Sequence, residues 1–522
     1  MSLELVKETV RINQPIGEES GRTIVENDII VPDVKPDIAR ILLLDGDAFI
    51  NGAEADSDEL IINGTVRYKI LYVSDDPDQP VKSINTTSDF TYPMNIPNVR
   101  QGMNCRVKCG IEHMEYEILN SRKINVKTIV SLYGRAANRL EQYITREFEG
   151  LEDIQILRNS VFINSYAGDS ETTCTVSETL ELPAGKPAIR EILRSDVKIT
   201  GKEFKPGDGK IVANGEINVS TLYIGDDETH SIQYMEHEIP FSHLIDLPDV
   251  NENSSCNMEF EIGELSFEPE EDADGELRMM KGEIMLNVYA EAFGSREIEL
   301  VEDAYSPNTG INLEKEELRM EELAAESKSQ ATIKETINIQ EDSPEISEVF
   351  NVLGRVSLSG SEIMDDRVSV EGAVECDILY LANNEEQPVF CITREIPFKQ
   401  IFDMKGVKPS MRLDLDTDIE QCSYSMLSAR EVEVRFVVGL AGRAVSQVAI
   451  PVIVKADEQP FDDKRLESRP SITIYFTQPG DTLWRIGKKY STTVNEVKKN
   501  NDIDDSGTIE AGSQILIPGK IG

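Results

Sequence analysis

The sequence predicts a mainly β protein, in which three homologous antiparallel β-sandwich or barrel-like domains are followed by a small βααβ domain. Strand-like segments recur every ten or so residues and are separated by Gly, Pro and Asp-Asp turns, as in sandwiches and barrels. Their side chains alternate, as in Val-Glu-Val-Arg-Phe from Val432, which is typical of half-buried strands. One phrase also recurs three times along the chain.

The recurring phrase defines the repeats. It reads INGTVRYKILYVSDD from Ile62, ANGEINVSTLYIGDD from Ala213 and VEGAVECDILYLANN from Val370. In each copy a Gly precedes a Tyr by eight residues, at the pairs Gly64 and Tyr72, Gly215 and Tyr223, and Gly372 and Tyr380. Three further positions keep the same order around each copy: Pro36, Pro187 and Pro344; Gly52, Gly201 and Gly360; and Tyr92, Phe241 and Phe398. A repeated ligand site is one interpretation, but glycine at a bulge or tight turn favours a structural role.

The domain boundaries follow from these repeats. We place the first repeat at residues 1–140, a connector with the second repeat at 141–300, and a helical connector with the third at 301–455. A linker at 456–470 precedes the last domain at 471–522. The connectors, AANRLEQYITREFEGLEDIQIL from Ala136 and NLEKEELRMEELAAESKSQ from Asn312, are rich in helix-forming residues, so we expect helices there.

Charge and composition exclude several classes of partner. The chain has 96 Asp and Glu against 52 Lys and Arg, a formal net charge of −44, which repels nucleic acid and anionic lipid headgroups. The surplus indicates solubility or, alternatively, a basic partner. We find no apolar run of 18 residues for a membrane span and no export signal at the N-terminus. Seven scattered cysteines, an odd number, predict reduced thiols in a cytoplasm.

Catalytic material is scarce. The common phosphate, dinucleotide, zinc-protease and serine-hydrolase motifs are missing, and the chain has four histidines, so we expect no enzyme, cofactor or metal. Cys105, Cys109 and His113 are spaced by four and could align on one face for a metal, although zinc sites usually add a second pair. The acidic stretch from Glu268 hints at a calcium loop, but Lys281 stands where the loop needs its final Glu, which favours a hairpin turn.

The last fifty residues follow a strand, helix, helix, strand pattern. Ile472, Ile474 and Phe476 alternate with polar or aromatic neighbours before a Gln-Pro-Gly turn, and Asp481 or Thr482 is placed to cap a helix. Thr493 and Glu496 form a capping-box pattern for a second helix. The returning strand is QILIP, from Gln514 to Pro518.

This segment resembles the LysM family. The matching positions are Tyr475, Pro479 to Trp484, Ile486, Tyr490, Val494, Val497, Asn500, Ile503, Ile509, Gly512 and Ile515 to Pro518. Thr477 and Gly487 depart from the usual Val and Ala, and the glycine lowers helix propensity by up to about 1 kcal/mol.

LysM modules mostly bind N-acetylglucosamine polymers in a groove between two loops, and the resemblance places these loops at Gly480 to Leu483 and Asn501 to Ile509. The candidate partner-binding residues that it implies are Ile472, Gly480, Asp481, Thr482, Leu483, Trp484, Asn501, Asp502, Ile503 and Ile509. We interpret Trp484, the only Trp, as an exposed anchor or, alternatively, a partly buried family residue.

The repeats resemble the SPOCS domain of spore-coat proteins, and SPOCS repeats followed by one LysM module are the layout of the SipL family. The resemblance implies a non-enzymatic scaffold of spore coat assembly in the mother-cell cytoplasm, at the forespore outer surface. LysM would dock on the coat ATPase SpoIVA, while the repeats would engage other coat proteins or each other. Residues 471–522 hold six basic and six acidic residues, so the whole −44 lies in residues 1–470 and the module has a separate role. The alternatives are a glycan-binding LysM protein of the cell or spore wall and, third, a carbohydrate-active enzyme.

Overall fold

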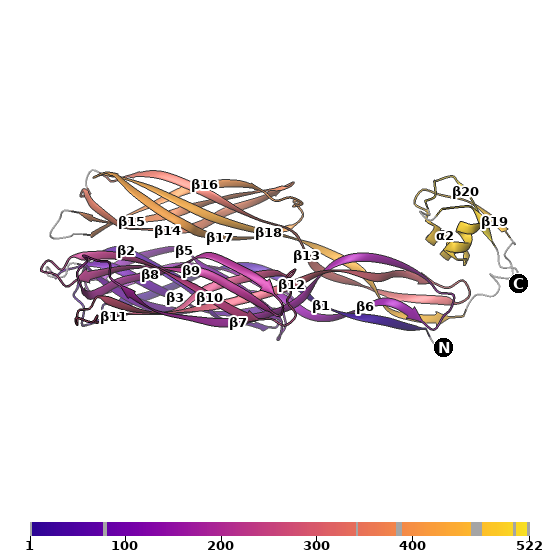
Figure 1. Ribbon diagram of the computed structural model, residues 1–522, viewed down its shortest axis with the longest axis horizontal. Coiled ribbons are helices and arrows are strands. Elements are labelled where there is room, and N and C mark those ends of the chain that lie inside the picture. The colour runs from indigo at the N-terminus through magenta and orange to yellow at the C-terminus, as the bar shows by residue number, and fades with distance from the viewer. Residues whose placement is uncertain are drawn as a thin grey trace.

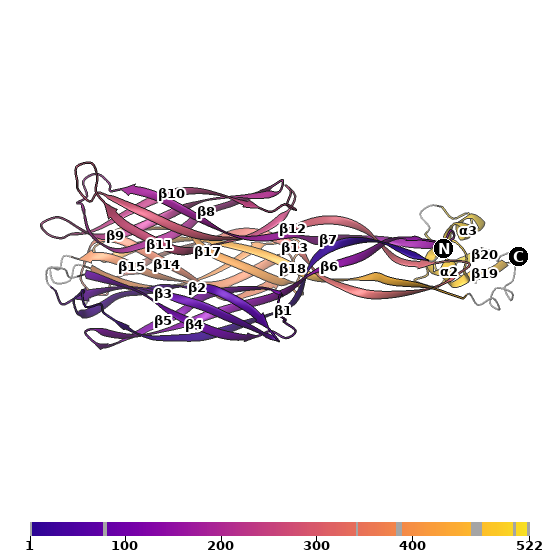
Figure 2. The same ribbon diagram turned by 90° about the horizontal axis from the view of Figure 1, so that it is seen from below.

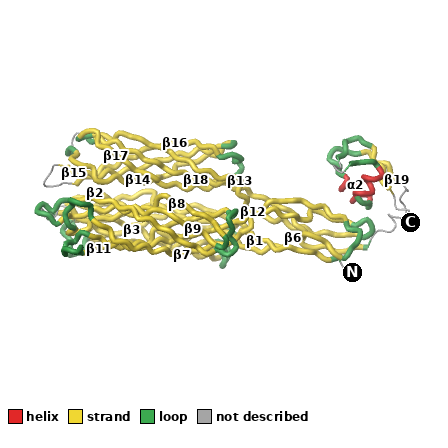
Figure 3. Tube along the Cα trace, viewed as in Figure 1, coloured by secondary structure: helices red, strands yellow, loops and turns green. Residues whose placement is uncertain are grey.

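The computed structural model describes residues 3–76, 81–340, 343–382, 389–460, 472–504 and 508–518. Strands make up most of the described residues, and the helices among these residues lie in the C-terminal module (Figure 3). The elements form an elongated molecule with a broad body at one end, a narrow stalk, and the module beside the far end of the stalk (Figure 1). The prediction of a mainly β protein is confirmed.

Each repeat is a sandwich of two three-stranded antiparallel sheets. In repeat 1 one sheet has the order β1-β6-β5 and the other β2-β3-β4, and repeats 2 and 3 use β7 to β12 and β13 to β18 in the same way. The strands of repeat 1 are β1 (Glu4–Ile30), β2 (Ile38–Asp56), β3 (Glu59–Ser74), β4 (Val81–Asn95), β5 (Asn104–Asn120) and β6 (Lys123–Glu149). Those of repeat 2 are β7 (Gln155–Glu181), β8 (Ile189–Gly207), β9 (Lys210–Gly225), β10 (Ile232–Asp246), β11 (Ser255–Glu270) and β12 (Met279–Tyr305). Those of repeat 3 are β13 (Gly310–Asn338), β14 (Ile346–Met364), β15 (Arg367–Ala382), β16 (Val389–Asp403), β17 (Arg412–Ser428) and β18 (Glu431–Gln459).

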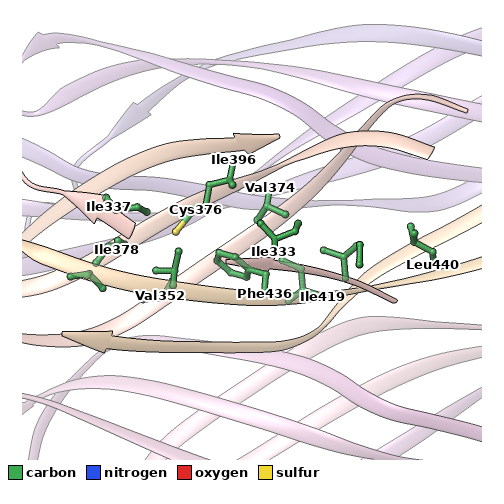
Figure 4. Packing of buried hydrophobic residues seen from close by; sticks show 14 of the residues in the cluster. Ile333, Ile337, Val352, Val374, Cys376, Ile378, Ile396, Ile419, Phe436 and Leu440 are labelled. Atoms are coloured by element: carbon green, nitrogen blue, oxygen red, sulfur yellow. The ribbon is translucent and has the colours of Figure 1, made fainter. Parts of the chain in front are cut away.

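Every repeat has its own apolar core between its two sheets. In repeat 3, Val374, Cys376 and Ile378 of β15 face Phe436 of β18, with Ile419 of β17 beside it (Figure 4). Alternate residues of each strand face this core because successive side chains of a strand point to opposite faces. The period-two pattern of the sequence therefore builds three separate cores.

The repeated Tyr and Gly positions are structural. Tyr72, Tyr223 and Tyr380 are fully buried, and each hydroxyl donates a hydrogen bond to a carbonyl of the repeated proline: Pro36 at 3.0 Å, Pro187 at 3.1 Å and Pro344 at 3.3 Å. Each repeated Gly pairs across the strands with a Phe whose ring covers it, in the pairs Gly64 and Phe90, Gly215 and Phe241, and Gly372 and Phe398. The motif thus ties each repeat together internally.

One alignment of the sequence was wrong. The residue equivalent to Phe241 and Phe398 is Phe90, because Phe90 pairs with Gly64. Tyr92, which was aligned with them, pairs with Ile62, two residues before Gly64 in β3. The shared Pro-Phe step of repeats 2 and 3 has no counterpart in repeat 1, so letter matching selected the wrong aromatic residue.

The two helical connectors were also wrong predictions. Ala136 to Glu149 ends β6, and Asn312 lies in β13, so both segments are long strands. Beyond Ala137, Phe293 and Val445 the third strand of each sheet has ended, and the two long strands continue as a two-stranded ribbon. We name these ribbon 1 (residues 4–15 and 137–149), ribbon 2 (155–166 and 293–305) and ribbon 3 (310–323 and 445–459). Cross-strand pairing overrides the helix propensity of their Glu, Leu and Lys residues.

The three ribbons pack together as the stalk (Figure 2). A two-stranded ribbon is marginal alone in water, so each ribbon buries one face against the other two. Their shared core contains Val10, Ile12 and Ile144 of ribbon 1, Ile163, Ile298 and Leu300 of ribbon 2, and Leu318, Met320, Ile450 and Val452 of ribbon 3.

A second shared core joins the three sandwiches of the body. Leu71, Leu222 and Leu379 occupy the same place in the repeated phrase and meet in one apolar cluster. Leu43 and Val81 of repeat 1, Leu193 and Ile224 of repeat 2, and Phe350 and Val389 of repeat 3 complete it. Because equivalent residues converge here and in the stalk, the repeats are arranged with approximate threefold symmetry.

The C-terminal module has its own small core. It consists of β19 (Ile472–Phe476), α2 (Leu483–Tyr490), α3 (Val494–Asn500) and β20 (Gln514–Pro518), and the two strands form one antiparallel sheet. Thr482 caps α2, and Thr493 with Glu496 forms the expected capping box of α3. Residues 456–459 of the expected linker still belong to β18, and its part from 461 to 470 lies outside the described residues.

Candidate partner-binding site

The first candidate loop joins β19 to α2. Gly480 has a φ of 87°, a left-handed conformation that glycine adopts without strain. The Asp481 carboxylate accepts hydrogen bonds from the Gln478 backbone N–H and the Tyr475 hydroxyl, both at 2.7 Å, and these bonds lower the pKa of Asp481. The loop is therefore held closed by its own carboxylate.

The second candidate loop joins α3 to β20 and is fixed by Asn501. Its side-chain amide donates to the Leu516 carbonyl at 2.7 Å and accepts from the Leu516 N–H at 2.6 Å, so it mimics a neighbouring strand. The Ile503 N–H returns to the Lys498 carbonyl at 3.2 Å, while Asp502 is exposed with a φ of 51°. Part of this loop, residues 505–507, lies outside the described residues.

The candidate residues divide into supporting and accessible groups. Leu483, Ile503 and Ile509 pack in or against the core of the module, so they support the loops rather than form their surface. Gly480, Thr482 and Asp502 are exposed at the loops, and Ile472 is exposed on β19. The small core thus brings both loops onto one compact module.

Trp484 has a different environment from the other candidates. Its indole Nε1–H donates to Asp303 Oδ2 at 3.0 Å, and its ring meets Tyr305 edge-on with centroids 4.8 Å apart. Asp303 and Tyr305 are at the end of β12, in ribbon 2. The only tryptophan is therefore partly buried against the stalk of its own chain.

Comparison with protein families agrees with this architecture. The family model described as SipL, SPOCS domain matches residues 37–119, 188–270 and 345–427, and the LysM domain model matches residues 475–518. The chain belongs to the SipL family. No curated protein and no solved structure matches it.

The matched segments of this SipL-family chain cover β2 to β5 of repeat 1 and their counterparts in repeats 2 and 3. The long strands β1 and β6, and their counterparts, lie outside the matched residues, yet they supply two of the three strands in one sheet of each sandwich. Neither helix of the described chain has the length and apolar character needed to cross a membrane.

The outer face of the two-stranded sheet of the LysM module is apolar and exposed. Ile472, Ile474 and Phe476 are 62%, 53% and 58% exposed, and Leu516, the cross-strand partner of Ile474, is 36% exposed. Tyr475 points the other way and packs against the core of the module. Of this face, sequence reasoning selected Ile472 alone. The alternation in SITIYF could have revealed Ile474 and Phe476 as well, because these two residues lie on the same face of the strand as Ile472.

A central cavity of about 1680 Å³ lies between the three sandwiches. Arg194 of β8 forms ion pairs with Asp45 of β2 and, at 2.5 Å, with Asp196. Asp45 also pairs with Arg355 of β14, so one carboxylate joins residues from all three repeats. These opposite charges neutralise each other and tie the repeats together. Sequence reasoning missed the network because its members lie far apart along the chain.

The weaker metal candidates gain no support. Cys105 and Cys109 face the core of repeat 1, but a bulge between Ile111 and His113 turns His113 to the exposed side, so the three do not share a face. In the acidic stretch from Glu268, Asp272 Oδ1 accepts the N–H groups of Asp274 and Glu276 at 2.9 and 3.1 Å, as in a tight hairpin turn. Within the described residues, no group of three His, Cys, Asp or Glu is placed to hold a metal ion.

Proposed function

We propose that this chain is a non-enzymatic scaffold of spore coat assembly, whose LysM module docks on the coat ATPase SpoIVA at the forespore surface. The observation that carries the proposal is the apolar outer face of the module, formed by Ile472, Ile474, Phe476 and Leu516. An exposed apolar patch on a small soluble module is typical of a protein interface. The three repeats, joined through shared cores, would carry the module and engage other coat proteins.

Charge supports a division of labour between body and module. The module is neutral by count, while residues 1–470 carry the whole formal charge of −44. An acidic body stays soluble and repels copies of itself, whereas the neutral module can approach a partner surface without that repulsion. Recognition is therefore assigned to the module.

Substitution of the apolar face tests the proposal. Ile472→Ser should weaken binding of the full chain to purified SpoIVA by about tenfold or more, because a central apolar contact is worth roughly 1–2 kcal/mol. Trp484→Ala should also weaken binding. Asn495→Ala, an exposed change on α3, is the matched control and should bind like the wild type. Titration calorimetry measures the affinity of the wild type and of the three variants for SpoIVA. Unchanged affinity of the Ile472 variant would contradict the proposal.

A glycan ligand is the second candidate, and the described parts of the two LysM loops favour it. Asp481 and Asn501 fix the start of each loop by hydrogen bonds, and the two loops flank the position where other LysM modules bind N-acetylglucosamine polymers. Titration of the full chain with chitin oligomers separates the candidates. Saturable binding of the oligomers together with no binding of SpoIVA would reverse their order.

A further inference from the structure

The module rests on the end of ribbon 2 through a compact set of contacts. Lys488 Nζ donates to both Asp303 carboxylate oxygens, at 2.6 and 2.7 Å, beside the indole hydrogen bond of Trp484. The Tyr305 hydroxyl donates to the Thr492 carbonyl at 2.8 Å, and both residues are buried, Tyr305 to 5% exposure. One carboxylate and one aromatic ring of the stalk thus engage three residues of the module.

Gly487 explains why the contact is so close. This position departs from the alanine usual in LysM modules, and a Cβ added to Gly487 would collide with the Tyr305 hydroxyl oxygen. It would also come within 3.0 Å of the Thr492 carbonyl oxygen, a smaller overlap within the module. The Tyr305 ring carbon that bears this hydroxyl would lie at an ordinary 3.5 Å. Glycine costs α2 helix propensity, and the tightest contact that it permits is the one with Tyr305 of ribbon 2.

Only one of the three ribbons offers this surface. Tyr305 ends β12, whereas the strands in the same place of ribbons 1 and 3, β6 and β18, end at Glu149 and Gln459. Neither of these residues supplies an aromatic ring for Trp484. The end of ribbon 2 is therefore distinct within an otherwise threefold stalk.

We propose that Asp303 and Tyr305 form a specific latch that holds the LysM module against ribbon 2 through Trp484, Gly487 and Lys488. The latch covers one side of the Trp484 indole, so a protein that binds this side must displace ribbon 2 first. The latch itself is independent of the proposed function. Only the second step, the competition between ribbon 2 and a binding partner for Trp484, rests on it. Because module and ribbon belong to one chain, their effective concentration is on the order of millimolar, and a small contact suffices to keep the latch closed.

Trp484 fluorescence measures the latch directly, because Trp484 is the only tryptophan of the chain. In the full chain, Tyr305→Ala should shift the emission to longer wavelength and raise quenching by acrylamide. Gly487→Ala should do the same, although it restores the usual LysM residue and favours the helix of the module. Gln459→Ala, at the end of ribbon 3, is the matched control and should leave the emission unchanged.

A rescue variant separates the latch from general damage. Tyr305→Phe removes the hydroxyl oxygen that Gly487→Ala would strike, so the double variant should regain most of the quenching protection that Gly487→Ala alone loses. Equal emission and quenching of the wild type, Tyr305→Ala and Gly487→Ala would overturn the latch. Failure of the rescue would overturn the role of Gly487 in it.

Binding of purified SpoIVA tests the second step. Tyr305→Ala should bind more tightly than the wild type, because the partner no longer competes with ribbon 2. If fluorescence shows an open latch and affinity is unchanged, the competition is wrong and the latch stands. If no variant binds SpoIVA, the proposed function fails, and the fluorescence result still decides the latch.

Discussion

At the scale of single residues, two carboxylates of the central cavity have pKa values displaced in opposite directions. Burial tends to raise the pKa of Asp45, but Arg194 and Arg355 outweigh it and hold the value at about 2. Burial raises the pKa of Asp377 to about 6, and the hydrogen bond from the Thr393 hydroxyl offsets only part of the effect. One cavity thus contains a carboxylate that is stable when ionised and another that is not.

We expect Asp377→Asn to stabilise the chain at pH 8. A carboxyl whose pKa is raised in the folded state contributes stability below its unfolded pKa, near 4, and loses it as the pH rises through about 6. The gain at pH 8 should therefore be up to about 3 kcal/mol, and it should vanish near pH 4. Denaturant unfolding at the two pH values measures the change in the free energy of unfolding.

Asp45→Asn is the matched control with the opposite sign. Because the pKa of Asp45 is lowered, its contribution is present above pH 4 and is lost as the pH falls toward 2. The variant should cost about 2 kcal/mol at pH 7, and less as the pH falls. A stabilising effect of Asp45→Asn at neutral pH, or no pH dependence for Asp377→Asn, would contradict the assignment of the network.

Residues whose roles depend on near neighbours could be predicted from the sequence, and those whose partners are distant could not. Thr493 and Glu496 lie three residues apart, so their capping box is visible in the letters. Asp45, Arg194 and Arg355 come from three repeats and meet only because the repeats close around an axis. Trp484 was interpreted as an exposed anchor or a partly buried family residue, and its contact with Tyr305 could not be predicted because Tyr305 lies in a segment with no local signal.

At the scale of elements, the Gly and Phe pair of each repeat lets two strands lie flat against one another. A Cβ at Gly64 would enter the Phe90 ring and approach the Phe49 carbonyl oxygen at 2.6 Å. Neither the backbone of β2, which is paired with β3, nor a buried ring can move away easily, so the pair fixes the register of β3 and β4.

Gly64→Ala should destabilise the chain by about 1–3 kcal/mol, the usual cost of overpacking a filled site. Gly52→Ala is the control, because nothing lies within 4 Å of its added Cβ, and this variant should change stability by well under the same amount. Thermal unfolding of both variants measures the difference. Equal effects at the two positions would show that the Phe90 ring is not packed on Gly64.

The sequence predicted strands well where apolar and polar residues alternate and failed where charge hid the alternation. Ribbon 3 contains EKEELRMEEL, which is favourable for a helix, yet Leu318 and Met320 lie two residues apart and both face the stalk core. The alternation of apolar and polar residues was present but short. The apolar residues that pack against Leu318 and Met320 come partly from the two other repeats. Local propensity could not reveal that three ribbons bury one another.

At the scale of the whole molecule, the repeats act as one body rather than three beads. The body core around Leu71, Leu222 and Leu379 and the stalk core each draw residues from every repeat. Three copies of one phrase predicted three domains, but their closure around an axis depends on surfaces that the repeats share. That closure places all three ribbon ends together, beside the LysM module (Figure 1).

The central claim is that the terminal module recognises the partner and the acidic body carries it. The most direct test is the affinity of purified SpoIVA for the full chain and for a chain that ends at residue 470. Circular dichroism should show that the shortened chain keeps its strands, because the shared cores lie before that residue. We predict that binding is lost with the module. Undiminished binding by the folded, shortened chain would contradict the account.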